Sequence, residues 1–316
     1  MGGTITILLF LYPINTVKKI DIRLILCYIK VVKKILLNNL KEEFIMLENK
    51  DRLRECLRNV IDLDKLFEYD ESVIISLLNE VDGLEDVVFL KAVKNDYAKV
   101  VEILLKYERV DPTAEDNYAI RYAAANGHAE IVEMLLKDKR VNPATKDNEA
   151  IMNAVGNGHT EVVEMLLRDE RVDPAADGNF AIKWAAEDGH DEVVELLLKD
   201  KRVDPAANDN WPIEIASENG HDEVVELLLR DKRVDPAADD NYAIRNAAAN
   251  GYVRVVELLL KDKRVNPGAD DNYAVRNAAG NGHTEVVAML LKDKRVNFTV
   301  AERIWLKILA KNIRKK

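Results

Sequence analysis

The sequence has few of the residues that build catalytic and metal sites. Its two cysteines, Cys27 and Cys56, form no CxxC pair and supply no disulfide framework, which favours a reducing, intracellular setting. Serine occurs only at Ser72, Ser76 and Ser217, and there is no glycine-rich phosphate loop or nucleophile motif. These absences predict a protein with no catalytic residues, no cofactor and no metal centre, and therefore not an enzyme.

Long apolar runs are also absent. The longest, residues 4–12, ends at Pro13 and is too short to span a bilayer, which needs about 20 residues. It does not read as a signal peptide, because no basic segment precedes it and no A-x-A-like site follows it. Residues 18–37 are apolar but interrupted by basic residues, which suits an amphipathic helix that could lie on an anionic membrane surface. Two alternatives stay open: a helix packed on the next one, or a protein that starts at Met46.

Positive charge is scarce in the body of the chain. The net charge is −10, but residues 1–45 carry +4 and residues 306–316 carry +5, which leaves −19 for the residues between them. An acidic body argues against binding a phosphate backbone, which needs a cationic face. We therefore expect no nucleic-acid partner.

What the sequence does contain is one unit repeated every 31 residues. Its clearest copy, RVDPAADDNYAIRNAAANGYVRVVELLLKDK, runs from Arg233 to Lys263, and a partial copy opens at Arg295. The six full copies begin at Arg109, Arg140, Arg171, Arg202, Arg233 and Arg264. A fixed period in this range is the signature of a stacked array, in which each unit buries its apolar face on its neighbours.

Each unit predicts two helices and a connecting arm. Residues 241–249 place Ile244, Ala247 and Ala248 on one helical face, with Asp240 or Asn241 as the N-cap. Gly251 ends this helix, because glycine takes positive φ freely.

The second helix of the unit is predicted at 223–229. Val224, Leu227 and Leu228 form its inward face, which Val225 and Leu229 widen. The connector that follows is too long for a tight turn and is predicted to be an extended arm with a proline.

The turn and second helix, Asn-Gly-His-x-Glu-Val-Val-x-Leu-Leu-Leu, resemble the motif of ankyrin repeats, and five of six full copies keep the histidine. The resemblance covers residues 86–310. Each copy has 31 residues, whereas the family's repeat has about 33, and the missing residues fall in the arm. They also differ at the family's tetrad Thr-Pro-Leu-His. The first copy has Tyr-Ala-Ile-Arg there, from Tyr118, and only the fourth copy, Trp-Pro-Ile-Glu from Trp211, keeps the proline. The shortened arm argues against a regular β-hairpin finger, and the RVDP/DNYAIR form resembles arrays encoded in large DNA viruses of amoebae.

The ends of the array predict a domain organisation. Residues 78–108 form a degenerate copy of the repeat that lacks the RVDP and DNYA portions, as expected of a terminal unit. After Arg295 a single helix is predicted at 300–313, with Trp305, Leu306, Leu309 and Ala310 on its packing face. The expected domains are a basic and apolar N-terminal extension at 1–45, a helical N-terminal cap with the degenerate repeat at 46–108, six ankyrin repeats at 109–294 and a C-terminal capping helix at 295–316.

Five histidines occupy one position of the repeat. They are His128, His159, His190, His221 and His283, with Tyr252 in the sixth copy. Stacked helices lie roughly 8–10 Å apart, too far for two such nitrogens to bind one zinc ion. We interpret these histidines as structural, each bonding to backbone at the turn. Paired acids such as Asp239-Asp240 recur in the same way and lack the unlike pair that acid–base catalysis needs.

Positions that vary between copies mark the predicted binding surface. The aromatic series Tyr118, Phe180, Trp211, Tyr242 and Tyr273 is nearly uniform and is interpreted mainly as packing between repeats. The resemblance implies that partners bind on the concave side, which the arms and first helices line. On that basis the predicted partner-binding residues are Tyr122, Trp184, Glu187, Trp211 and Glu218, aromatic anchors with an acidic rim. Relaxed constraint in duplicated repeats is the alternative explanation of the same variation.

The sequence thus predicts an all-α ankyrin repeat solenoid, built of stacked helix-turn-helix units with connecting arms. Its expected function is a non-catalytic protein–protein interaction scaffold that uses the concave face. The expected partner is an unknown protein with a basic or mixed surface, and the chain is expected to be a monomer in the cytoplasm, or in the host cytoplasm if it is viral. The alternative is a membrane-peripheral adaptor that docks through residues 18–37 while the array displays a partner.

Liposome flotation separates the two hypotheses. If the adaptor hypothesis is right, the full chain floats with vesicles that contain anionic lipid, and a chain that begins at Met46 stays in the soluble fraction. Vesicles of neutral lipid are the control, because they offer no electrostatic attraction. If both chains stay soluble beside anionic vesicles, the adaptor hypothesis is wrong.

Overall fold

The computed structural model describes residues 74–75, 78 and 85–313 of the 316, and within them the ordered backbone is helical, with no strand. The extension predicted at 1–45, its segment 18–37 and the helices predicted before residue 74 lie outside the described residues. The helices are α6 (Glu85–Lys94), α7 (Ala98–Leu105), α8 (Ala114–Ala125), α9 (Ala129–Lys137), α10 (Thr145–Gly156), α11 (Thr160–Leu167), α12 (Ala176–Asp188), α13 (Asp191–Lys199), α14 (Ala207–Asn219), α15 (Asp222–Arg230), α16 (Ala238–Asn250), α17 (Val253–Lys261), α18 (Ala269–Gly280), α19 (Thr284–Leu290) and α20 (Val300–Ile313). None of these helices has the length and apolar character needed to cross a membrane.

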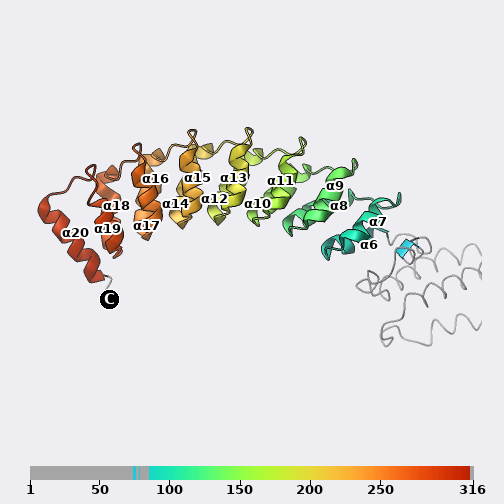
Figure 1. Cartoon of the computed structure of the whole chain (residues 1–316), viewed down its shortest axis with the longest axis horizontal. Coiled ribbons are helices and arrows are strands. Elements are labelled where there is room, and N and C mark those ends of the chain that lie inside the picture. The colour runs from blue at the N-terminus through green and yellow to red at the C-terminus, as the bar shows by residue number, and fades with distance from the viewer. Residues whose placement is uncertain (1–73, 76–77, 79–84, 314–316) are drawn as a thin grey trace, which may run out of the picture. The chain divides into compact units, whose positions relative to one another are not determined.

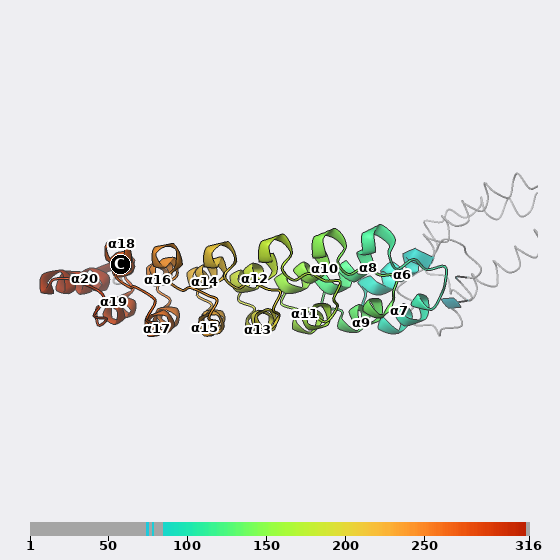
Figure 2. The same cartoon turned by 90° about the horizontal axis from the view of Figure 1, so that it is seen from above.

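The helices fall into two compact units. The first includes residues 85–123 and 133–141, and the second includes 124–132 and 142–313. In the first unit α6 packs on α7, as predicted from the degenerate copy at residues 78–108. In the second unit, even-numbered helices α10 to α18 pack on one another in one layer, and odd-numbered helices α11 to α19 pack in a second layer (Figures 1 and 2). This is the all-α repeat solenoid that the sequence predicts.

The buried residues follow the predicted periodicity closely. Ile244, Ala247 and Ala248 are fully buried on α16, and the small alanines allow the neighbouring helices of the layer to approach closely. On α15 the fully buried residues are Val224, Val225 and Leu228. The predicted inward position of Leu227 is wrong, since this side chain is only partly buried. Burial of consecutive residues 224 and 225 reflects a helix that packs against its own first helix and two neighbouring repeats.

Each first helix, within the bounds given above, begins with one turn of left-handed backbone. Asp239, Asp240 and Asn241 have φ of 44°, 51° and 63°, and each of the five other full copies has three residues with positive φ at the same place. Such a conformation costs about 1–2 kcal/mol per residue outside glycine and is tolerated best by Asn and Asp. The predicted N-cap at Asp240 or Asn241 is therefore wrong. The Asn241 side chain instead accepts a hydrogen bond from the backbone N–H of Asn266 in the next repeat, with Oδ1 and N 2.5 Å apart.

The arm that joins two repeats is held by the arginine of RVDP. Arg233 forms a two-pronged ion pair with Asp231, with Nε 3.0 Å from Oδ1 and Nη2 2.6 Å from Oδ2. Its Nη1 donates to the carbonyl of Val203 in the preceding repeat at 2.8 Å. The pairing holds the pKa of the Asp231 carboxyl below its ordinary value. Val234 beside it is fully buried, so the arm is anchored by one charged and one apolar residue.

The last helix, α20, packs on α18 and α19. Leu306 is buried there as predicted, and Leu309 is partly buried. The predicted packing position of Trp305 is wrong, because this side chain is 60% exposed. The physical reason is the helical period: residue 305 lies about 100° from residue 306, which turns it toward the exposed stripe with Ile304 and Ile308.

The arginine contact yields a stability prediction. Arg233→Ala should lower the free energy of unfolding by about 2 kcal/mol, because it removes a two-pronged charged pair and leaves a carbonyl of the preceding repeat without its donor. Arg230→Ala is the matched control: Arg230 pairs with Glu226 across one exposed helical turn, 2.7 Å apart, and its loss should cost about 0.3–0.5 kcal/mol. Urea unfolding measures both. Equal effects would show that the arm contact adds nothing beyond a surface pair.

Candidate protein-binding site

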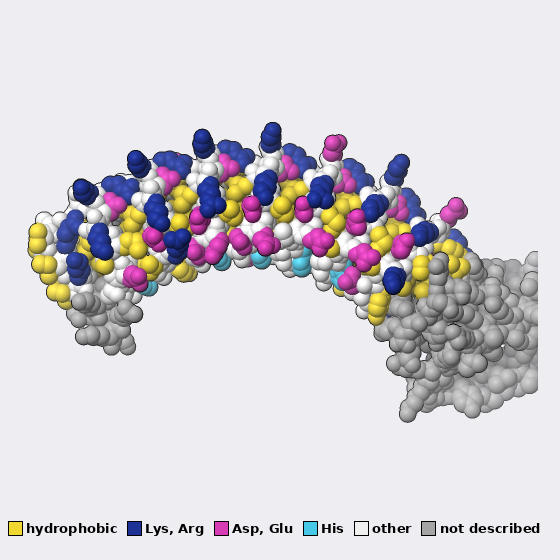
Figure 3. All heavy atoms as spheres, in the orientation of Figure 1, with side chains coloured by type: hydrophobic (Ala, Val, Ile, Leu, Met, Phe, Trp, Pro, Cys, Tyr) yellow, Lys and Arg dark blue, Asp and Glu magenta, His cyan; other side chains and the backbone are white. Residues whose placement is uncertain are grey.

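The histidines form an edge of the second unit (Figure 3). His159 Nε2 lies 3.0 Å from the carbonyl oxygen of Ala125, and His221 Nε2 lies 2.8 Å from that of Glu187, in each case at the end of the preceding first helix. The imidazole also covers the glycine of that turn: a Cβ on Gly189, which has φ of +74°, would lie 2.5 Å from His221 Nδ1. The predicted bond from the imidazole to the backbone is thereby confirmed for His159, His190 and His221. Within the described residues no group of three or more His, Cys, Asp or Glu could hold a metal ion.

Four of the five predicted partner-binding residues lie on two adjacent helices. Trp184 and Glu187 are on α12, and Trp211 and Glu218 are on α14, which packs against α12. All four side chains are partly exposed. Because residues 184 and 187, and likewise 211 and 218, are one or two helical turns apart, each pair lies along one face of its helix. The structure therefore places these four residues on two neighbouring first helices of the second unit.

Tyr122 belongs to the first unit and lies on α8. Its ring centroid is 5.7 Å from that of Tyr118, and Lys94 Nζ is 5.0 Å from the Tyr118 centroid and 5.7 Å from the Tyr122 centroid. A lysine from α6 thus already contacts this aromatic pair, within the distance at which cation–π attraction acts.

Trp184 and Glu218 are positioned by neighbouring repeats. The Trp184 ring meets Phe180 edge to face at 4.7 Å, and it also covers Gly156 of α10, where an added Cβ would lie 3.2 Å from the ring. Glu218 accepts a hydrogen bond of 2.8 Å from the Tyr242 hydroxyl. This bond and burial raise the pKa of Tyr242 to about 12. The contact supports packing between repeats for Tyr242, although the aromatic series as a whole is partly exposed rather than buried.

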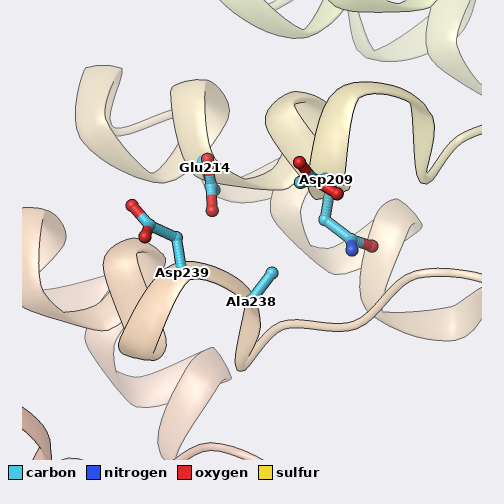
Figure 4. Close-up of a pocket in the computed structure, with 5 residues that line it drawn as sticks. Asp209, Glu214, Ala238 and Asp239 are labelled. Atoms are coloured by element: carbon cyan, nitrogen blue, oxygen red, sulfur yellow. The ribbon is translucent and has the colours of Figure 1, made fainter.

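A hollow of about 500 Å³ opens between α14 and α16 beside this surface. Asp209, Asn210 and Glu214 line it from α14, and Ala238 and Asp239 line it from α16. Figure 4 shows the carboxylates of Glu214 and Asp239 directed into the space between the two helices. Oε1 of Glu214 is buried and makes no hydrogen bond. The hollow is thus acidic and has no cation among its lining residues.

The carboxyl group of Glu214 has a raised pKa. Burial, together with the negative charges of Asp239 and Asp209, raises its pKa to about 7, although Arg245 on α16 opposes the shift. At neutral pH the carboxyl is therefore divided between its protonated and ionised forms. An added positive charge in the hollow would favour the ionised form.

The repeat architecture agrees with the comparison to known families. A family model described as ankyrin repeats (3 copies) matches residues 67–147, 141–209 and 213–301, well over half of the chain. The chain belongs to the ankyrin repeat family. Ankyrin repeats generally mediate protein–protein interaction and are typically not catalytic. A comparison with curated proteins finds no match for the chain.

The predicted set of binding residues does not include Glu214, Asp239 and Asp209, which line the hollow. A comparison of the repeat copies in this ankyrin array could have identified Glu214. The position that Glu214 occupies is arginine, methionine or lysine in the five other full copies, so a single acid stands out there. No such signal exists for Asp209 and Asp239, because acids are common in the turn that precedes every first helix.

The shifted pKa of Glu214 predicts a pH-dependent stability. The folded pKa of about 7 lies above the ordinary value of 4.5, so folding favours the protonated carboxyl. Its stabilising effect is complete below the ordinary value and is lost as the pH rises through about 7. Glu214→Gln keeps an uncharged group at every pH, so this variant should gain about 1 kcal/mol over the native chain between about pH 5 and about pH 8, after allowance for solvent screening of a partly exposed group.

Thermal unfolding at the two pH values measures this gain. The control is Glu195→Gln, since Lys199 holds the pKa of Glu195 below its ordinary value and the carboxyl is ionised at both pH values. A gain of equal size in the two variants, or none in Glu214→Gln, would contradict the assignment.

Proposed function

We propose that this ankyrin array is a non-catalytic scaffold that binds a protein partner through the surface formed by α12 and α14. The observation that supports it most directly is the pair of partly exposed tryptophans, Trp184 and Trp211, on adjacent first helices, with Glu187 and Glu218 beside them. Tryptophan is the side chain most enriched at the energetic centre of protein interfaces. The proposal also includes Tyr122, which lies in the first unit.

The charge of the surface defines the partner. Glu187, Glu218 and the acidic hollow beside them supply negative charge, and the repeats contribute most of the −19 that lies between residues 45 and 306. A basic or mixed protein surface complements this charge and would associate faster at low salt. We further propose that the chain acts in the cytoplasm, as ankyrin repeat proteins commonly do, and that its resemblance to the arrays of amoebal viruses reflects a role in host interaction.

Affinity capture with the full chain as bait tests the proposal. A partner identified from source-cell lysate and then purified should bind the native chain, and Tyr122→Ala/Trp184→Ala should weaken the affinity by roughly thirtyfold, because buried interface aromatics contribute about 2 kcal/mol or more. Trp305→Ala is the matched control, since Trp305 is an exposed tryptophan on α20, outside the proposed surface.

Circular dichroism would establish that both variants fold. A partner that loses affinity equally for both variants, or for neither, would place the interface elsewhere. No captured partner under any condition would contradict the scaffold function itself.

A further inference from the structure

One position of the repeat carries a cation in four of its six full copies. The six residues at this position are Arg121, Met152, Lys183, Glu214, Arg245 and Arg276. The fourth copy is the only one with an acid there, and its acid is the Glu214 that lines the hollow.

Two of the arginines show what a cation does at this position. Arg121 donates from Nη2 to the carbonyl of Glu115 at 2.9 Å and from Nε to that of Asp116 at 3.1 Å, both in its own left-handed turn. Arg245 donates from Nη2 to the carbonyl of Asp239 at 3.0 Å. Its Nη1 reaches the next repeat and lies 3.0 Å from Asp270 Oδ2. The cation therefore binds carbonyls of its own left-handed turn, and in the copy with Arg245 it also pairs with a carboxylate 25 residues further on.

The cation also lies over an aromatic ring three residues before it. The Arg121 guanidinium carbon is 5.6 Å from the Tyr118 ring centroid, and Lys183 Nζ is 5.2 Å from that of Phe180. The fourth copy has Trp211 at the aromatic position, and tryptophan is the ring that attracts cations most strongly. Within the described residues no lysine or arginine lies over Trp211.

The fourth copy thus keeps the groups that receive a cation and lacks the cation itself. By the same spacing, its receiving groups are the carbonyl of Asn208 and the carboxylate of Asp239. Asp239 lines the hollow, and the buried Oε1 of Glu214 faces it without a hydrogen-bond partner. Arg245 is directed to the next repeat, where it pairs with Asp270.

We propose that the hollow between α14 and α16 binds an arginine or lysine side chain of the protein partner, which supplies the cation that the fourth repeat lacks. This inference rests on the proposed function, because it specifies one contact of the same partner. Arginine fits best: its planar guanidinium has five N–H donors, and the hollow offers the carboxylates of Glu214, Asp239 and Asp209.

Binding should strengthen as the pH rises through about 7. Glu214 faces Asp209 and Glu218 from α14, and Asp239 and Arg245 from α16, and its carboxyl ionises in this range. Ionisation adds the negative charge that the guest cation requires, so the cation and the proton compete for the same hollow.

The test uses the full chain and a small probe, the peptide acetyl-Gly-Arg-Gly-amide. Its control replaces arginine with citrulline, which has almost the same shape but no charge. In an NMR titration the arginine peptide should shift the backbone amide signals of residues 209–211, 213–214 and 238–239, with an affinity about tenfold above that of the citrulline peptide. The affinity should be higher at pH 8 than at pH 6. Equal binding of the two peptides at this site, or binding of neither, would overturn the proposal.

The matched protein variant is Glu214→Arg, which restores the residue type of Arg121 and Arg245 and should therefore fold. It should abolish binding of the arginine peptide, and unchanged binding would overturn the proposal. A titration with calcium chloride or magnesium chloride alone forms a further arm. Shifts of the same signals by a metal ion, with none from the arginine peptide, would identify a metal site instead.

The captured partner separates this inference from the proposed function. A partner that binds Glu214→Arg as tightly as the native chain, but is lost with Tyr122→Ala/Trp184→Ala, would refute the arginine contact and leave the scaffold function intact. A partner that binds Glu214→Arg at least tenfold more weakly would support both.

Discussion

The contact on which the array depends is the arginine that opens each RVDP segment. From Arg140 to Arg295 its guanidinium pairs with an aspartate two residues earlier, which restricts its freedom, whereas Arg109 of the first copy pairs with Glu85 instead. Arg233 to Val203, Arg264 to Val234 and Arg295 to Val265 repeat the same hydrogen bond at 2.8, 2.6 and 2.6 Å. A charged donor to a carbonyl is stronger than a neutral one, and its geometry is directional. Packing of valines and leucines gives the layers their cohesion, and this bond sets the spacing from one repeat to the next.

The shortened arm makes a second set of bonds necessary. Because the arm forms no hairpin in the described residues, its backbone groups need partners elsewhere. The asparagine that ends each left-handed turn supplies one: Asn148, Asn179 and Asn210 accept from the backbone N–H of a residue 25 positions later, at 2.8, 2.7 and 2.6 Å. The asparagine at the end of the left-handed turn thus bonds to the next repeat, and this bond offsets part of the energetic cost of that conformation.

Repetition also makes the exceptions informative. When most copies place the same kind of residue at one position, the copy that departs from it indicates what that residue does. Glu214 replaces a residue that is basic in four copies, and the result is an acidic hollow, a buried carboxyl oxygen without a partner and a pKa near 7. Such local departures from an otherwise consistent pattern are where functional sites are expected. Glu214 lies three residues after Trp211 on the same helix, so the departure falls on an element of the proposed binding surface.

Much of this could be predicted from residue spacing, and the misses share one cause. Periodicity gave the helices near 223–229 and 241–249, the buried Ile244, Ala247 and Ala248, and the structural histidines, because each depends on contacts within one repeat or on a repeated neighbour. Leu227, Trp305 and the N-cap at Asp240 or Asn241 were misjudged, because helical spacing alone does not say how wide the buried stripe is or whether a turn is left-handed. Three consecutive positive φ values have no sequence signature beyond a preference for Asp and Asn.

The amino-acid sequence by itself determined the architecture. Units of 31 residues, each with two amphipathic helices, bury their apolar faces by stacking on one another. Tertiary structure alone decided where the charges meet. Asp209 and Glu214 come from one repeat and Asp239 from the next, so their proximity depends on the distance between stacked helices. The pKa of Glu214 follows from that distance and from burial, and neither quantity is written in the spacing of residues along the chain.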